Sequence, residues 1–263
     1  MNPRRRLLLA AAGVWLAPAP LARAAAPTTP VIEVKSELLL KDDIAAMEAR
    51  YRRFAEYVAA RMQVPIALYV TANPDPETHE EYSMLVAPPV IIKRALRLGY
   101  TPLAQTHAKD RIIFAVGANT AYNRLPQLRG ARLGLPPKGS EGEHMARRAL
   151  AKLAVTNPET FFGYVRYATA QETAIKALRA GVVDLAAISE RVLPKDEPGI
   201  NRIFTSTSFA ENGIAVIGRP GTPPFERLRK ALFLPDEAGR KVMEEAGLSP
   251  LDAMDNTFFV DGA

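Results

Sequence analysis

The chain has 263 residues and a formal net charge of +6 at pH 7, from 34 Lys and Arg and 28 Asp and Glu residues. Acidic and basic residues alternate along its body without a basic stripe, which argues against a nucleic-acid-binding surface. It contains no cysteine, which excludes disulfides and the lipid-modified cysteine that tethers some exported proteins to a membrane.

The first 24 residues have the layout of a cleavable export signal. Arginines at positions 4–6 precede an apolar stretch at 7–17, and Ala22-Arg23-Ala24 supplies a small-x-small cleavage site. The apolar stretch is shorter than the roughly 20 residues that span a bilayer, so cleavage is favoured over a retained anchor. The general secretory route and the twin-arginine route fit equally. An exported protein without a lipid anchor is expected to be periplasmic.

Alternating strands and helices are predicted after this segment. A first strand in "PVIEVKS" is followed by apolar residues at helical spacing from Ile44 to Met62. Short strands are expected in "VPIALYV" and "YSMLVA", and a helix begins at Pro88-Pro89 and ends at Gly99. The segments "TPLAQT" and "RIIFAVG" read as two more strands.

A second set of elements follows. Strands are predicted in "LRGARLGLP", "YVRYA" and "VVDLAAI", with two helices between them. The pairs Ser140-x-x-Glu143 and Thr169-x-x-Glu172 have the spacing of capping boxes at the starts of these helices. A long extended segment at 202–218 precedes two helical patterns, "PFERLRKALF" and "DEAGRKVMEEAG".

Strands that alternate with capped helices indicate an α/β fold with mostly parallel sheets and helices on both faces. We expect two lobes with flanking helices, one formed by residues 25–115 plus 209–263 and the other by 116–208. The segment at 202–218 would cross back to the first lobe, which gives two hinge strands. A ligand of such a fold sits in the cleft, at the carboxyl ends of strands and the starts of helices.

The sequence lacks the motifs of common exported enzymes. There is no G-x-S-x-G nucleophile elbow and no cysteine nucleophile. His79, His107 and His144 form no H-E-x-x-H pair and no other set with metal-ligand spacing. We therefore expect no catalysis, no metal and no cofactor, and we interpret the histidines as solvated or hydrogen-bonded.

The loop "LPPKGSEGEH" is a candidate anion site. A helix start offers free N–H groups, Ser140 adds a hydroxyl and Lys138 adds charge. Glu141 opposes an anion there, and Ser140 and Glu143 fit a purely structural cap equally well. Thr169 and Gln171 at a helix start, and Ser189 with Glu190 after a strand end, face the presumed cleft in the same way, although an ordinary β-α-β unit also explains them.

Three segments together resemble the phosphate/phosphonate-type substrate-binding proteins of ABC importers, which have the type 2 periplasmic binding fold. They are "VAPPVIIKRALRLGYTPLA", "LRGARLGLP…S-x-G" and "TAQETAIKALRAGVVDLAAI". The resemblance implies two mixed sheets and a receptor that closes on a small solute. It also implies that an oxyanion binds at an S-x-S/T-G-like helix start, which here is Ser140-Glu141-Gly142. Glutamate replaces the expected hydroxyl residue there and would repel a dianion.

We therefore predict a monomeric periplasmic receptor that delivers a small oxyanion or polar metabolite to a membrane permease. A sensor or accessory subunit for a membrane kinase or redox partner is the alternative, and an exported hydrolase is less favoured. The predicted ligand-binding residues are Ser36, Pro88, Lys138, Ser140, Thr169, Gln171 and Ser189.

Overall fold

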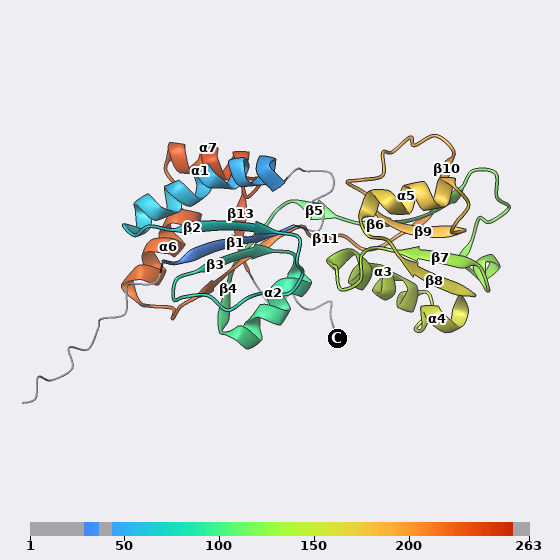
Figure 1. The fold of residues 1–263 in the computed structure, drawn as a ribbon, viewed down its shortest axis with the longest axis horizontal. Helices are drawn as coiled ribbons and strands as arrows, with labels where there is room; N and C mark the ends of the chain where they lie inside the picture. The colour runs from blue at the N-terminus through green and yellow to red at the C-terminus, as the bar shows by residue number, and fades with distance from the viewer. Residues whose placement is uncertain (1–28, 37–43, 255–263) are drawn as a thin grey trace, which may run out of the picture.

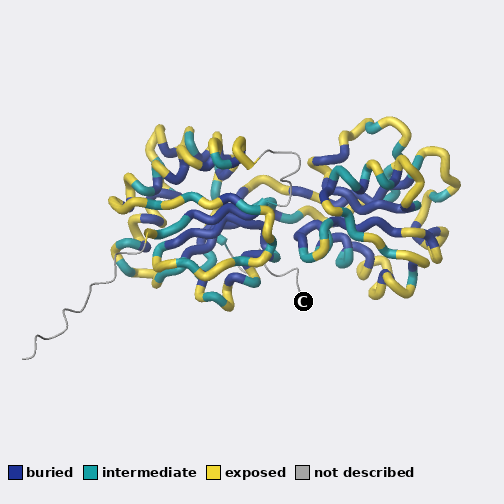
Figure 2. The backbone as a smooth tube through the Cα atoms, viewed as in Figure 1, coloured by how far each residue is buried: buried dark blue, intermediate teal, exposed yellow. Residues whose placement is uncertain are grey.

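The chain folds into two α/β lobes (Figure 1). A computed structural model describes residues 29–36 and 44–254, and the predicted export signal lies outside these residues. In each lobe the strands form the buried centre and the helices and loops carry the exposed surface (Figure 2). Within the described ranges, no helix is long and apolar enough to cross a membrane.

The first lobe is built on a six-stranded sheet in the order β13-β4-β12-β3-β1-β2. Strand β1 is parallel to β2 and β3, whereas β12 lies antiparallel between β3 and β4. The strands are β1 (Val31–Lys35), β2 (Ala67–Thr71), β3 (Met84–Ala87), β4 (Tyr100–Thr106), β12 (Gly213–Ile217) and β13 (Leu251–Ala253). The sheet is mixed, so the expectation of mostly parallel sheets is wrong here. The reason is that the returning chain inserts β12 between two strands of the first set.

Helices cover both faces of this sheet. Helices α1 (Ile44–Met62), α6 (Pro223–Phe233) and α7 (Glu237–Glu245) cover one face, where their apolar side chains pack on residues such as Ile32 and Val34. Helix α2 (Pro89–Ala95) packs on the other face. It continues into a 3-10 turn, η1 (Leu96–Leu98), and Gly99 ends it with φ of 86°. A left-handed φ at the helix end favours glycine, as predicted from the sequence.

The second lobe has a five-stranded sheet in the order β10-β6-β9-β7-β8, with β7 parallel to β8 and β9 and the other pairs antiparallel. Helix α3 packs on one face and α5 on the other. The elements are β6 (Ile112–Gly117), η2 (Leu125–Leu128), β7 (Arg132–Leu135), α3 (Glu141–Lys152), α4 (Pro158–Phe161), β8 (Tyr164–Tyr167), α5 (Gln171–Arg179), β9 (Leu185–Ser189) and β10 (Ile200–Thr205). The two mixed sheets with flanking helices confirm the predicted fold class.

Two antiparallel segments join the lobes, β5 (Lys109–Asp110) and β11 (Phe209–Ala210). The sequence placed the first lobe boundary after residue 115, but β6 already belongs to the second sheet. Its consecutive residues Ile112 and Ile113 face the two cores of that lobe, one on each side of the sheet. The outward crossover is therefore at β5, about five residues earlier than predicted, and the return crossover is at β11.

Candidate functional site

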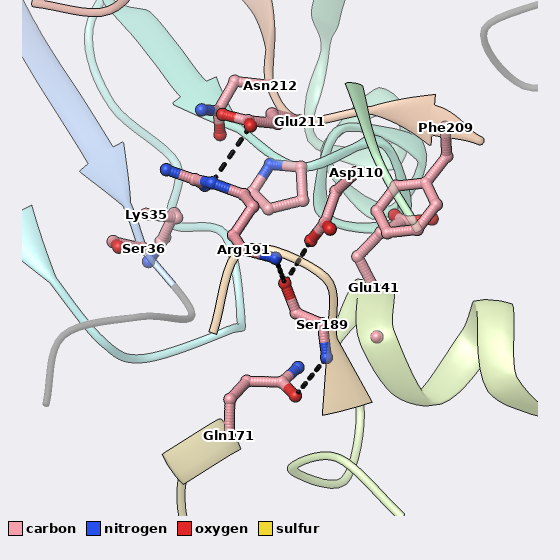
Figure 3. A pocket seen from close by; sticks show the side chains of 12 residues that line it. Lys35, Ser36, Asp110, Glu141, Gln171, Ser189, Arg191, Phe209, Glu211 and Asn212 are labelled. Carbon is pink, nitrogen blue, oxygen red and sulfur yellow. Dashed lines mark hydrogen bonds and ion pairs between the residues drawn. The ribbon is translucent and has the colours of Figure 1, made fainter. Parts of the chain in front are cut away.

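A small cavity of about 60 Å³ lies between the two lobes (Figure 3). Strand ends and helix starts meet there, because Lys35 ends β1, Ser189 ends β9 and Gln171 begins α5. This is the position at which open α/β sheets bind ligands. The cavity is lined by Lys35, Ser36, Pro88, Asp110, Glu141, Gly142, Gln171, Ser189, Arg191, Phe209, Glu211 and Asn212.

Ser189 is the centre of a hydrogen-bond network on the second-lobe wall. Its hydroxyl donates to Oδ2 of Asp110 at 2.6 Å, and its N–H donates to Oε1 of Gln171 at 3.1 Å. The N–H of Arg191 in turn donates to the Ser189 hydroxyl at 3.2 Å. Burial raises the pKa of Asp110, although the bonds from Ser189 and from the N–H of Arg111 favour its charged form. The network fixes the orientation of the polar groups of this wall.

Gly142 allows the side chain of Gln171 to reach its place. A Cβ atom at position 142 would lie 2.6 Å from Nε2 of Gln171 and 3.1 Å from Cβ of Pro136. Gln171 is buried and its Oε1 is already bonded to Ser189, so its amide has little room to move away. A larger residue at position 142 would therefore have to displace the amide of Gln171 and press on Pro136.

An ion pair connects the second lobe with the return crossover. Nε of Arg191 lies 3.0 Å from Oε1 of Glu211, and both residues line the cavity. Burial raises the pKa of Glu211, whereas the charge of Arg191 lowers it. Because Arg191 follows β9 and Glu211 follows β11, this pair holds the second lobe against the segment that enters the first lobe.

Glu141 carries a second contact between the lobes. Its carboxylate Oε2 accepts a hydrogen bond of 2.6 Å from the N–H of Val90, in the first turn of α2. Beside it, Nη2 of Arg94 donates to the carbonyl of Gly139 at 2.8 Å. Burial raises the pKa of Glu141 to about 7, although the bond from Val90 and the charge of Arg94 favour ionisation. The chain thus places its own carboxyl group in the interlobe space.

Two cations contribute positive charge to the cavity. Nζ of Lys35 is buried, and it lies 2.6 Å from Oε1 of Glu33 and 2.7 Å from the carbonyl oxygen of Asp75. Arg191 is the other cation, and it is paired as described. The lining therefore combines two fixed cations with three carboxyl groups whose pKa values burial raises. A site of this kind is close to neutral when some of these carboxyl groups are protonated.

Four of the seven predicted ligand-binding residues line the cavity together, namely Ser36, Pro88, Gln171 and Ser189. The other three lie elsewhere. Lys138 is exposed, with Nζ 5.9 Å from the centroid of the Tyr167 ring. The Ser140 hydroxyl caps α3 by accepting from the N–H of Glu143 at 3.1 Å. Thr169 is exposed on a different groove.

The hydrogen bonds at the starts of α3 and α5 explain why Ser140 and Thr169 do not line the cavity. The side chain of Glu143 accepts from the N–H of Gly139 at 2.6 Å, so the predicted capping box forms in part and occupies Ser140. Helix α5 begins one residue later than predicted, with Ala170 as its N-cap residue. Thr173 supplies the bonding there, since its hydroxyl donates to the carbonyl of Ala170 at 2.6 Å. The predicted capping box at Thr169 is therefore wrong.

Sequence reasoning missed most of the charged residues of the cavity. Lys35, Asp110, Arg191 and Glu211 all lie within two residues of a strand end, which is the signal that could have found them. Glu190 was expected to face the cleft beside Ser189. It lies instead 3.6 Å from Arg202, and Arg191 takes the cleft position. The irregular chain after β9 decides which side chain faces inward, and strand alternation does not predict it.

Comparison with known families gives a match over residues 39–258 to the model described as ABC transporter, phosphonate, periplasmic substrate-binding protein. The chain belongs to this family. The match covers most of the chain, from the residues after β1 through both crossovers, and it agrees with the resemblance found in the sequence. No curated protein matches the chain in sequence.

Solved structures with low sequence identity share the fold. The Xanthomonas citri protein XAC2383 bound to ATP is 13% identical with a TM-score of 0.70, and the match covers 89% of this chain and 94% of that one. PhnD1 of Prochlorococcus marinus, in complex with methylphosphonate, is 10% identical with a TM-score of 0.67, covering 89% and 95%. A binding protein component of an ABC phosphonate transporter from Pseudomonas aeruginosa is 13% identical with a TM-score of 0.63, covering 88% and 84%. These likenesses establish the type 2 periplasmic binding fold of the family.

Proposed function

We propose that the chain is the receptor of an ABC importer, and that its two lobes close around one small anionic solute in the interlobe cavity. The observation that carries the proposal is the position and lining of this cavity. Strand ends and helix starts of both lobes supply a hydroxyl, an amide and two cations to one small space. Polar groups fixed in this way replace the hydration shell of a solute when the lobes close.

The charge of the lining favours a singly charged oxyanion over a dianion. Asp110, Glu141 and Glu211 together outnumber the two cations, Lys35 and Arg191. Burial raises the pKa of all three carboxyl groups, and that of Glu141 to about 7, so part of the negative charge of Glu141 is absent near neutral pH. The similar proteins noted above include one solved with methylphosphonate, and a sulphonate-binding protein of Escherichia coli has a TM-score of 0.53. Both ligand groups are small oxyanions.

The remaining features of the proposal follow from the sequence. Residues 1–24 are cleaved during export, and the mature protein works as a monomer in the periplasm. It presents its solute to a membrane permease without chemical change. The absence of nucleophile and metal-ligand motifs supports a binding role over the hydrolase alternative. A gene neighbourhood with a permease and an ATPase would support import, whereas one with a kinase or a cytochrome would support sensing.

Thermal unfolding of the mature protein with a panel of oxyanions tests this proposal. The panel contains phosphate, methylphosphonate, small sulfonates and small carboxylates at millimolar concentration. A ligand at 100 times its Kd stabilises the folded state by about 2.7 kcal/mol, which raises Tm by several degrees. The shift should shrink in Ser189→Ala and persist in the control Thr169→Ala, whose side chain lies outside the cavity. A panel that gives no shift, or equal shifts in both variants, would contradict the proposal.

A further inference from the structure

A buried carboxylate lies behind the cavity wall, on the first strand of the chain. Side chains alternate along β1, so Ile32 and Val34 enter the core under α1. Glu33 and Lys35 point to the opposite face and are both buried, with exposed fractions of 0% and 2%. Burial of a carboxylate is costly unless it is paired and hydrogen-bonded. The groups around Glu33 must therefore compensate the charge of its buried carboxylate.

The segment that follows β2 closes over Glu33. Nε2 of His79 lies 3.3 Å from Oε2 of Glu33, and the carboxylate of Glu77 is nearby. Donor atoms of Glu33, Glu77 and His79 all lie within 4.8 Å of one another. Both Oε atoms of Glu33 and Nε2 of His79 are buried, and among the described residues they have no hydrogen-bond partner of acceptable geometry. Lys35 approaches Oε1 at 2.6 Å as an ion pair, which leaves Oε2 directed at His79.

We propose that Glu33, Glu77 and His79 form a binding site for a divalent transition-metal ion of the zinc type. Zinc binds imidazole nitrogen and carboxylate oxygen at about 2.0–2.2 Å in tetrahedral geometry, so two ligand atoms are about 3.3–3.5 Å apart. The distance of 3.3 Å between Oε2 of Glu33 and Nε2 of His79 already fits this separation between two ligand atoms. Glu77 is exposed and can rotate toward the ion, and a water completes the fourth position. An imidazole ligand disfavours Mg²⁺ and Ca²⁺, which prefer oxygen.

The net negative charge of the cluster favours the binding of a cation. Glu33 and Glu77 bring two negative charges, and Lys35 brings one positive charge on the far oxygen of Glu33. The ammonium group opposes the metal, but it also holds Glu33 in a fixed orientation, as outer-shell partners of metal ligands do. Because Lys35 lines the solute cavity as well, an ion on Glu33 would leave the ammonium charge less neutralised toward the cleft. The metal site itself does not depend on the proposed function.

Sequence spacing could not reveal this site. Glu77 and His79 are two residues apart in a loop, but Glu33 comes from β1, 44 residues before Glu77. Only the parallel pairing of β1 with β2 brings the loop after β2 over the end of β1. The prediction of no metal rested on linear motifs, which do not capture ligands from two separate elements.

Titration of untagged mature protein with Zn²⁺, in competition with a chromophoric chelator, tests the proposal. The wild type should bind one ion, and Co²⁺ in its place should give the visible absorption of a four-coordinate site. The double variant Glu77→Gln/His79→Ala removes two ligands while leaving buried Glu33 in place. Its affinity should fall by at least about 100-fold, beyond the effect of losing an outer-shell partner. The matched control Glu80→Gln/His107→Ala changes one exposed glutamate and one exposed histidine outside the cluster.

The outcomes separate clearly. One ion bound by the wild type and the control, and lost in the double variant, supports the site. No stoichiometric binding by folded wild type would overturn the proposal. Equal affinity in the double variant and the wild type would also overturn it, because the ion would then bind elsewhere. Circular dichroism of each variant checks that the fold is retained.

Discussion

Replacement of Glu141 by glutamine should make the protein more stable at alkaline pH. The carboxyl group of Glu141 is buried between the lobes and accepts the N–H of Val90 at 2.6 Å. A glutamine keeps an oxygen that can accept this hydrogen bond, but it cannot ionise. The substitution Glu141→Gln therefore removes the cost of a buried charge while retaining the contact with α2.

The size of the effect follows from the pKa of Glu141. Burial raises it from 4.5 to about 7, so the folded state holds the proton more tightly than the unfolded state. The free energy of unfolding then falls as pH rises through the window from 4.5 to 7. One pKa unit corresponds to about 1.4 kcal/mol, which gives a loss of about 3 kcal/mol above pH 7. Below pH 4.5 both states are protonated and the loss vanishes. The variant should match the wild type near pH 4.5 and exceed it by about 3 kcal/mol at pH 8.

Urea unfolding at pH 4.5, 6 and 8, followed by circular dichroism, measures this difference. Fluorescence is unsuitable because the only tryptophan, Trp15, lies in the predicted export signal. The control Glu80→Gln removes an exposed carboxylate and should leave the pH dependence unchanged. A difference between Glu141→Gln and the wild type that stays constant with pH would refute the reasoning. Lower stability of this variant at pH 8 would refute it as well.

Three further predictions concern the cavity. Gly142→Ala should weaken solute binding, measured by calorimetry, by at least about 10-fold, because the new Cβ displaces Gln171. The control Gly117→Ala should leave binding unchanged, because a Cβ at position 117 has no neighbour closer than 3.7 Å. Arg191→Ala removes one of two cations and should raise the Kd of an oxyanion by about 10-fold, equivalent to about 1.4 kcal/mol. Oxyanion affinity should fall as pH rises through about 7, where Glu141 ionises, and a Kd independent of pH between 6 and 8 would contradict this.

Local sequence signals predicted most of the elements and the fold class. The helical spacing from Ile44 to Met62 matches the bounds of α1, and Gly99 ends the helical segment that starts at Pro89. These features depend on neighbours within a few residues. The insertion of β12 between β3 and β4 depends on pairing across more than 100 residues, so the mixed sheet was not visible in the alternation of strands and helices.

The residues of the candidate site were likewise predicted only in part from the sequence. Gln171 and Ser189 were predicted because strand ends and helix starts converge in this fold, and they line the cavity together with the predicted Ser36 and Pro88. The charged lining was missed because its residues belong to the crossovers and to irregular chain. Their inward direction is set by contacts between the lobes, such as the pair of Arg191 with Glu211. Such contacts are not encoded in the periodicity of any single element.

Calorimetric titration of the mature protein at pH 6 with the oxyanion panel tests the central claim most directly. The account predicts that one member binds with 1:1 stoichiometry, and that the double variant Gln171→Ala/Ser189→Ala weakens its binding by at least about 100-fold. A control at Lys138→Ala/Thr169→Ala, outside the cavity, should retain wild-type affinity. Binding that survives the loss of Gln171 and Ser189, or a folded protein that binds no member of the panel, would contradict the claim.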